Sequence, residues 1–421
     1  MLTKLKPRSE FSRNVLTLMT GTTIAQAIPI AISPILTRIY TPEDFGVFAL
    51  YMSIASILSV VATGRYEMAI MLPKKDEDAI NIMVLSIAIS FFVSFISFLI
   101  VFIFNTQITE LLGNPEISNW LYFIPVTVLL TGIYQSFNYW SNRKKQYKRL
   151  ATSRVIQSSA ASATNLGMGF GGFGTSGLIF GQLIGQSFAV TVLGKMVFRE
   201  MKSKFLHVKR LKIIAMVKRY LDFPKHSLPT AFLDVMSLNL PLYLINILFS
   251  VQLLGYYSFA YRMIQFPSAL VSGAFSQVFY QKFSSLAFEP LEQKKFLILT
   301  WLKLFFIGFF PFLLVFIYGS EIFAFVFGEN WREAGKIASI LSVMLFFVFV
   351  SSPTSSAFVV LRMQKIGLYF GISVLIYRPL ALYYGYLMND FWLGLKLMTL
   401  FESIQIVVYN IIILFKLKDM R

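Results

Sequence analysis

The chain has 421 residues, of which 56% are hydrophobic and only 14% are charged, and its mean hydropathy is +0.67. A soluble globular protein carries about 25% charged residues, so this composition predicts a polytopic membrane protein. There is no cysteine, and the only histidines are His207 and His226, which excludes disulfides, thiol catalysis and a metal site built from histidine and cysteine. We therefore expect neither a metal nor a cofactor.

The hydropathy pattern predicts an all-α integral membrane fold with twelve transmembrane helices. A helix needs about 20 apolar residues to cross the hydrocarbon layer. Segments that meet this requirement lie at about 14–38, 45–70, 81–104, 119–140, 151–172, 176–198, 227–249, 252–280, 297–318, 336–361, 367–388 and 391–415. The longest expected outer connection, about 319–335, is short and has no histidine, which argues against an enzyme with an external catalytic domain.

The basic residues alternate between the connections of these helices. The segments assigned to the cytoplasm hold 30 of the 38 lysines and arginines, whereas the outer connections hold only Arg38, Arg332 and Lys336. Basic residues are retained on the cytoplasmic side of a membrane. The pattern predicts that both termini are cytoplasmic and that the first span is uncleaved. It also predicts that the net charge of +18 serves topology and contact with anionic lipid, not nucleic acid.

A basic segment at Lys195–Lys225, with ten lysines and arginines, divides the chain. It predicts an N-terminal six-helix bundle at 1–198, a cytoplasmic linker at 199–226 and a C-terminal six-helix bundle at 227–421. The first hairpin, ILTRIYTPEDFGVFALY (35–51), resembles LINILFSVQLLGYYSFA (244–260), with Gly46 and Gly255 in register. Six spans per half is an even number, so we expect a parallel repeat about a pseudo-twofold axis along the membrane normal.

Glycines mark close helix packing rather than nucleotide binding. Gly177, Gly181 and Gly185 recur every four residues, a spacing that lets a neighbouring helix backbone approach. A G-x-G-x-x-G pattern at 169–174 follows no predicted strand, so we interpret it as a chance match to the dinucleotide-binding fingerprint.

Eight ionisable residues fall inside the predicted spans, where charge is costly and marks a pair or a pathway. Lys303 and Lys396 lie near span ends and are expected to reach the interface. Arg378 and Glu402 are each twelve residues from the turn at Asp390, so both lie near the membrane midplane and are predicted to pair. The other four are Arg65, Glu67, Asp234 and Arg262.

Two readings of the Arg378–Glu402 pair remain open: a structural salt bridge, or a pair broken and remade during proton-coupled transport. Arg65 and Glu67 are two residues apart on one expected helix, so they should point to different sides and not pair. Asp234 is a candidate acceptor for a coupling H⁺ or Na⁺, or alternatively a hydrogen-bond partner between helices.

The chain resembles the polysaccharide-export (Wzx-type) flippases of the multidrug/oligosaccharidyl-lipid/polysaccharide exporter superfamily. The resemblance rests on motifs in the family's order, among them LTRIYTPEDFG (36–46), GRYEMAIMLP (64–73), RKKQYKRLATSRVIQS (143–158), GLIFGQLIG (177–185), FPKHSLPTAFLD (223–234), YRMIQFPSALVSGAFSQVFYQKFS (261–284), FGENWREAG (327–335) and SSPTSSAFVVLRMQK (351–365). The last two spans match in hydropathy only.

The resemblance implies transfer of a polyprenyl-diphosphate-linked oligosaccharide from the cytoplasmic to the periplasmic leaflet of the bacterial inner membrane, by alternating access with H⁺ or Na⁺ coupling. Such a protein would serve envelope polysaccharide synthesis alongside other polysaccharide-assembly membrane proteins. Arginine suits diphosphate recognition. The candidate cargo-binding residues are Arg262, Arg65, Arg378, Tyr257 and Tyr261, the tyrosines stacking on sugar rings, and the candidate coupling residues are Asp234, Glu402 and Glu67.

Two other functions remain. A multidrug or organic-cation antiporter would share the fold but would favour an anionic site, whereas the eight in-span groups comprise five basic and three acidic residues. A membrane-embedded oligosaccharide polymerase or ligase would need catalytic groups in a larger external loop than this chain offers.

Overall fold

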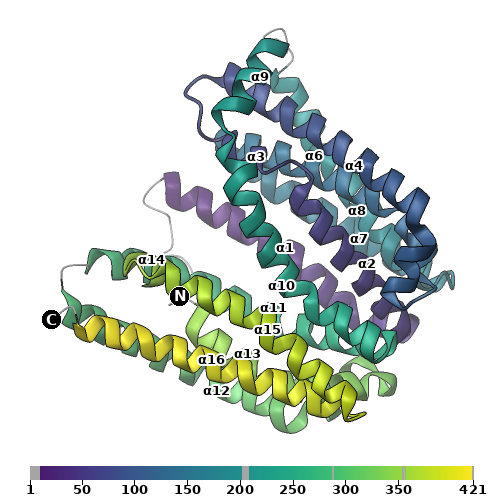
Figure 1. The fold of residues 1–421 in the computed structure, drawn as a ribbon, viewed down its shortest axis with the longest axis vertical. Helices are drawn as coiled ribbons and strands as arrows, with labels where there is room; N and C mark the ends of the chain where they lie inside the picture. The colour runs from purple at the N-terminus through teal and green to yellow at the C-terminus, as the bar shows by residue number, and fades with distance from the viewer. Residues whose placement is uncertain (1–9, 202–207, 287–288, 353–354, 356, 420–421) are drawn as a thin grey trace. The chain divides into compact units, whose positions relative to one another are not determined.

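The computed structural model describes residues 10–201, 208–286, 289–352, 355 and 357–419 (Figure 1). The described residues are nearly all helical and contain no strand. The expectations for residues 1–9, 202–207 and 420–421, which include Lys4, Lys6 and Arg8 and part of the linker, fall outside the described residues.

The helices are α1 (Glu10–Ile39), α2 (Pro42–Val61), α3 (Tyr66–Ala69), α4 (Asp76–Leu112), α5 (Ile117–Leu121), α6 (Ile124–Arg143), α7 (Tyr147–Phe170), α8 (Thr175–Met201), α9 (Arg210–Arg219), η2 (Phe223–Ser227), α10 (Leu228–Leu248), α11 (Val251–Ser285), α12 (Pro290–Phe327), η3 (Glu329–Trp331), α13 (Arg332–Ser351), α14 (Ala357–Val360), α15 (Gln364–Leu387) and α16 (Phe391–Asp419).

Each of the twelve expected spans coincides with a helix of at least 20 residues. Within the described residues, ten helical segments are both long and apolar enough to cross a membrane; α7 and α11 are long enough but more polar. The all-α integral membrane fold is therefore confirmed. That α7 and α11 also cross the membrane, which would give twelve spans, stays a prediction.

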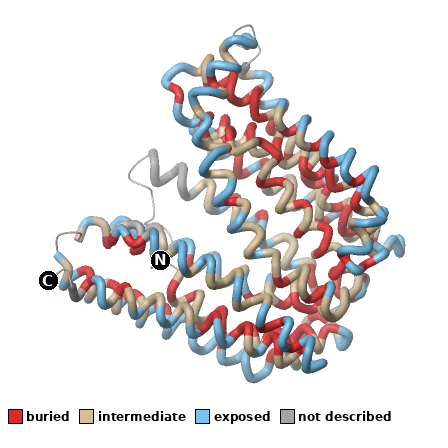
Figure 2. Tube along the Cα trace, in the orientation of Figure 1, coloured by how far each residue is buried: buried red, intermediate tan, exposed pale blue. Residues whose placement is uncertain are grey.

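Many large apolar residues of the long helices are exposed, and exposed residues are pale blue in Figure 2. On α4 they include Phe92, Phe95 and Phe102, and on α12 they include Phe306 and Phe310, all at least 60% exposed. A protein in water would bury such side chains, whereas lipid tails solvate them. These faces are the expected lipid-facing surfaces.

The helix expected at 45–70 ends earlier, because α2 stops at Val61. Gly64 and Arg65 both have positive φ angles, 59° and 62°, which no helix can accommodate. The short helix α3 follows this turn. The hydropathy of the segment did not reveal the turn, although Gly64 was an available signal.

The chain divides into two compact units, Met1–Met236 and Ser237–Arg421. In unit 1, α7 packs against α1 and α8, and α4 packs against α6 and α9; in unit 2, α12 packs against α13 and α15 against α16. The boundary falls within α10, ten residues after the expected end of the linker. The described part of that linker contains the helix α9. This helix packs on α4, and an ion pair of 2.9 Å between Lys212 and Glu77 joins the two.

Backbone landmarks recur in the same order in the two halves, 209 to 217 residues apart. Thr41 and Ser250 each cap a helix by accepting a hydrogen bond from the amide three residues on. Phe104 in α4 and Tyr318 in α12 interrupt their helices with φ of −112° and −114°. Positive φ recurs in the pairs Gly113 and Gly328, Lys145 and Arg362, and Gly172 and Asn389. These correspondences support the repeat, while the pseudo-twofold axis stays a prediction.

The glycines of α8 lie where α7 approaches most closely. A Cβ added at Gly185 would lie 2.6 Å from the carbonyl oxygen of Gln157, and one at Gly181 would collide with Asn165. Real Cβ atoms do not approach so closely, so only glycine fits. The interpretation of these glycines as packing residues is confirmed.

Candidate functional site

The predicted pair between Arg378 and Glu402 is present in unit 2. Arg378 on α15 donates from Nε to Glu402 Oε2 at 3.0 Å and from Nη2 to Oε1 at 2.6 Å. Both side chains are mostly buried, at 13% and 12% exposed. The two-point geometry is the strongest arrangement available to an arginine and a carboxylate. It explains how two charges are tolerated deep between antiparallel helices.

Arg378 also donates a hydrogen bond to a backbone carbonyl of α10 that lacks its usual donor within its own helix. Its Nη1 donates to the carbonyl oxygen of Ser237 at 3.0 Å. In a regular helix that carbonyl would accept from residue 241, but Pro241 has no N–H. One arginine therefore joins three helices, α10, α15 and α16. Sequence reasoning missed this third partner, although the spacing of four residues between Ser237 and Pro241 was a usable signal.

Tyr257 and Tyr261 of α11 lie near this ion pair. Their rings stack with centroids 6.1 Å apart, and both interact electrostatically with Arg378 and Glu402. Tyr257 is buried at 6% exposed, so in this conformation its ring packs within the protein. Tyr377, which the sequence analysis did not single out, also interacts with the pair. That these tyrosines contact sugar rings stays a prediction.

The prediction that Arg65 and Glu67 do not pair is wrong. Arg65 Nη1 lies 3.6 Å from Glu67 Oε1. The prediction assumed one continuous helix, but Arg65 precedes α3 in a left-handed conformation, which turns its side chain toward Glu67. Glu67 is 1% exposed and also accepts a hydrogen bond from the Thr63 hydroxyl.

Replacing Glu67 with Ala should destabilise the protein by about 1–3 kcal/mol, because the buried Thr63 hydroxyl loses its acceptor. Denaturant titration of the purified protein in detergent would measure the change in unfolding free energy. Glu110→Ala is the matched control, since Glu110 is exposed on α4. Equal stability of the two variants would contradict a stabilising role for the Thr63–Glu67 contact.

The structure does not join Arg262 or Asp234 to these clusters. Arg262 lies on α11 and Asp234 on α10, and both side chains are exposed. Neither has a hydrogen bond or ion pair with any described residue. The same is true of Lys303 and Lys396 within the described part of the chain. Of the eight in-span groups, four form two ion pairs, which leaves three cations and one anion without a partner among the described residues.

The fold matches that of known membrane transporters. The inward-facing and the outward-facing structures of a multidrug resistance MATE family transporter of the MOP superfamily superpose with TM-scores of 0.60 and 0.61, each at 12% identity. The matches cover 96% and 97% of this chain, and 95% and 96% of the transporter chains. A MOP superfamily transporter from Pyrococcus furiosus, described with a binding pocket of reverse polarity that suggests a different function, gives a TM-score of 0.54 at 13% identity and covers 97% of this chain and 96% of its own. The protein thus has the fold of the MOP superfamily transporters.

The sequence also matches a family model over residues 35–336, described as polysaccharide biosynthesis protein. The chain belongs to this family, which confirms the resemblance noted from its motifs. No curated protein matches the chain.

Proposed function

We propose that this protein is a flippase that moves a polyprenyl-diphosphate-linked oligosaccharide from the cytoplasmic to the periplasmic leaflet for envelope polysaccharide synthesis. The observation that carries the proposal is the polysaccharide biosynthesis family match on a chain with a MOP transporter fold. The family match supports a role in polysaccharide biosynthesis, and the fold match supports a transporter. The proposed mechanism is alternating access with ion coupling, and it requires no chemical transformation of the cargo.

The distribution of charge supports an anionic cargo. After the internal pairs are set aside, the described in-span groups without a partner are three cations and one acid. The cations are Arg262, Lys303 and Lys396, and the acid is Asp234. A diphosphate carries fixed negative charge, and a guanidinium offers two parallel donors to its oxygens. Because Lys303 and Lys396 lie near span ends, Arg262 is the proposed diphosphate contact, and Arg65 is the secondary candidate. Asp234, Glu402 and Glu67 are the proposed coupling residues.

Replacing Arg262 with Gln should reduce transport of the lipid-linked oligosaccharide by at least about tenfold, because the variant loses a charge-assisted contact of about 1.5–3 kcal/mol. The assay is leaflet transfer of a polyprenyl-diphosphate oligosaccharide in proteoliposomes. Lys303→Gln is the matched control, since it removes another unpartnered in-span cation. Equal rates in the Arg262 variant and the wild type would exclude Arg262 as the headgroup contact.

The second candidate is a multidrug or organic-cation antiporter, favoured by the fold similarity to a multidrug resistance MATE family transporter. It predicts ion-driven uptake of an organic cation by the same proteoliposomes, with no transfer of the lipid-linked glycan. That combination of results would replace the flippase proposal.

A further inference from the structure

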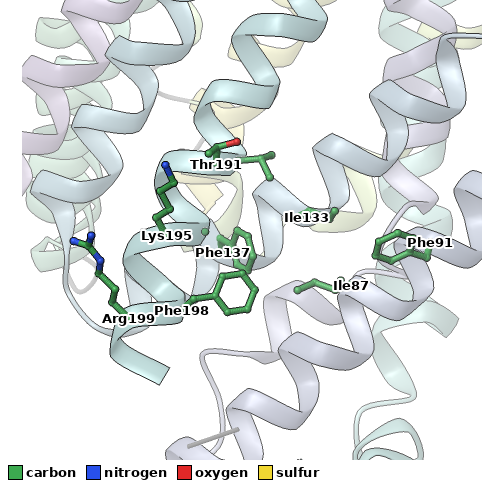
Figure 3. Close-up of a pocket in the computed structure, with 10 residues that line it drawn as sticks. Ile87, Phe91, Ile133, Phe137, Thr191, Lys195, Phe198 and Arg199 are labelled. Carbon is green, nitrogen blue, oxygen red and sulfur yellow. The ribbon is translucent and has the colours of Figure 1, made fainter. Parts of the chain in front are cut away.

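Unit 1 contains an apolar groove of about 830 Å³ that the proposed transport function does not use. It lies among α4, α6 and α8, and its walls include Ile87, Phe91, Ile133 and Phe137 (Figure 3). Gly194 and Thr191 of α8 line it with small side chains, so the groove is open along this helix. A volume of this size falls within the range of about 300–1,000 Å³ that ligand sites occupy.

Two cations lie at one side of the groove. Lys195 and Arg199 are on the last two turns of α8, away from Phe91 (Figure 3). Both are exposed, and neither has a hydrogen bond or ion pair with any residue that the structure describes. The adjacent acid, Glu200, is already bound by Arg149 at 3.1 Å through both terminal guanidinium nitrogens. The positive charge at this end is therefore not neutralised by Glu200.

The groove is about as long as one lipid leaflet is thick. Its lining extends along α8 from Val190 to Arg199, nine residues or about 14 Å of helix rise. Half of the hydrocarbon layer is about 15 Å thick. The basic pattern of the connections predicts that the Lys195 end lies on the cytoplasmic side. An occupant thus needs an anionic headgroup at that level and apolar chains no longer than one leaflet.

We propose that this groove binds an anionic phospholipid of the cytoplasmic leaflet. Lys195 and Arg199 contact the headgroup phosphate, and the acyl chains lie against Ile87, Phe91, Ile133 and Phe137. Basic pockets between transmembrane helices on the cytoplasmic side are suited to such headgroups. A polyprenyl chain exceeds one leaflet in length, so the groove fits a phospholipid better than the proposed cargo.

The test is native mass spectrometry of the full chain in detergent, titrated with phosphatidylglycerol or phosphatidylcholine. We expect the first phosphatidylglycerol to bind more tightly than phosphatidylcholine. The double variant Lys195→Gln/Arg199→Gln should weaken phosphatidylglycerol by about thirtyfold, at about 1 kcal/mol for each basic residue. The control, Arg210→Gln/Lys218→Gln, removes two exposed cations of α9 outside the groove and should retain the preference.

A second variant tests the apolar part. Thr191→Trp fills the groove from the exposed side of α8 and keeps both cations, so it should weaken the first binding of both phospholipids. No preference in the wild type, or an equal loss in the α9 control, would overturn the proposal. Displacement of bound phosphatidylglycerol by undecaprenyl diphosphate would identify the groove as a cargo site and would also overturn it. These measurements detect binding alone, so their outcome is independent of the flippase assay.

Discussion

Replacing Glu402 with Gln is expected to destabilise the protein by about 3–5 kcal/mol, the cost of leaving one member of a buried ion pair without its partner. Arg378 would keep its positive charge and lose both carboxylate contacts, which are 2.6 and 3.0 Å long. The unfolding free energy, measured by SDS titration in mixed micelles with circular dichroism, checks this value. Stability equal to that of the wild type would contradict an essential pair in the folded protein.

A compensated variant separates a structural role from a transport role. Arg378→Leu/Glu402→Leu removes both charges, and replacing a buried pair by apolar residues is often neutral or stabilising. That change would leave the Ser237 carbonyl without its donor, so Pro241→Ala is added to restore the backbone N–H. We expect the triple variant to fold. If it also transports, the pair is structural; if it folds but does not transport, the pair takes part in the transport cycle.

The second large effect is expected at Gly185. Gly185→Val should destabilise unit 1 by about 3 kcal/mol, the upper end of the usual overpacking cost, because the new Cβ would meet the Gln157 carbonyl at 2.6 Å and the Ala161 Cβ at 2.8 Å. Relief requires a shift of the α7 backbone, not merely a new rotamer. Thermal unfolding of the purified protein would measure the loss.

Gly167→Val is the matched control for Gly185. Gly167 is also in a long helix, α7, but a Cβ there would have no atom within 4 Å. Both substitutions place a β-branched residue in a helix, so their difference isolates the close contact. Equal melting temperatures for the two variants would show that α7 and α8 do not depend on a glycine at their contact.

Gly185 and Glu402 lie 217 residues apart, as do Ala161 and Arg378. This is the spacing of the repeated landmarks Lys145 and Arg362. At corresponding positions, α7 and α8 thus meet through two small residues, whereas α15 and α16 meet through an ion pair. Under the predicted repeat, the buried charge pair of one half corresponds in position to a close backbone contact in the other half.

The sequence by itself determined the helices, the membrane environment and the family. Apolar segments of about 20 residues and the alternation of basic connections follow from lipid solvation, which acts on each segment separately. The pairing of Arg378 with Glu402 was also predictable, because helix rise sets the depth of both residues from the Asp390 turn.

Only the tertiary structure decided the local contacts of the sites. The pairing of Arg65 with Glu67 depends on a left-handed residue within an apolar stretch, where hydropathy does not distinguish a buried turn from a helix. Likewise, the partner of the Ser237 carbonyl depends on which helix packs beside the gap made by Pro241. The groove beside Lys195 requires α4, α6 and α8 together. The last two features join residues far apart in the chain, so they follow from packing and not from the properties of any one segment. The Arg65–Glu67 contact is local, but it depends on a turn that hydropathy does not reveal.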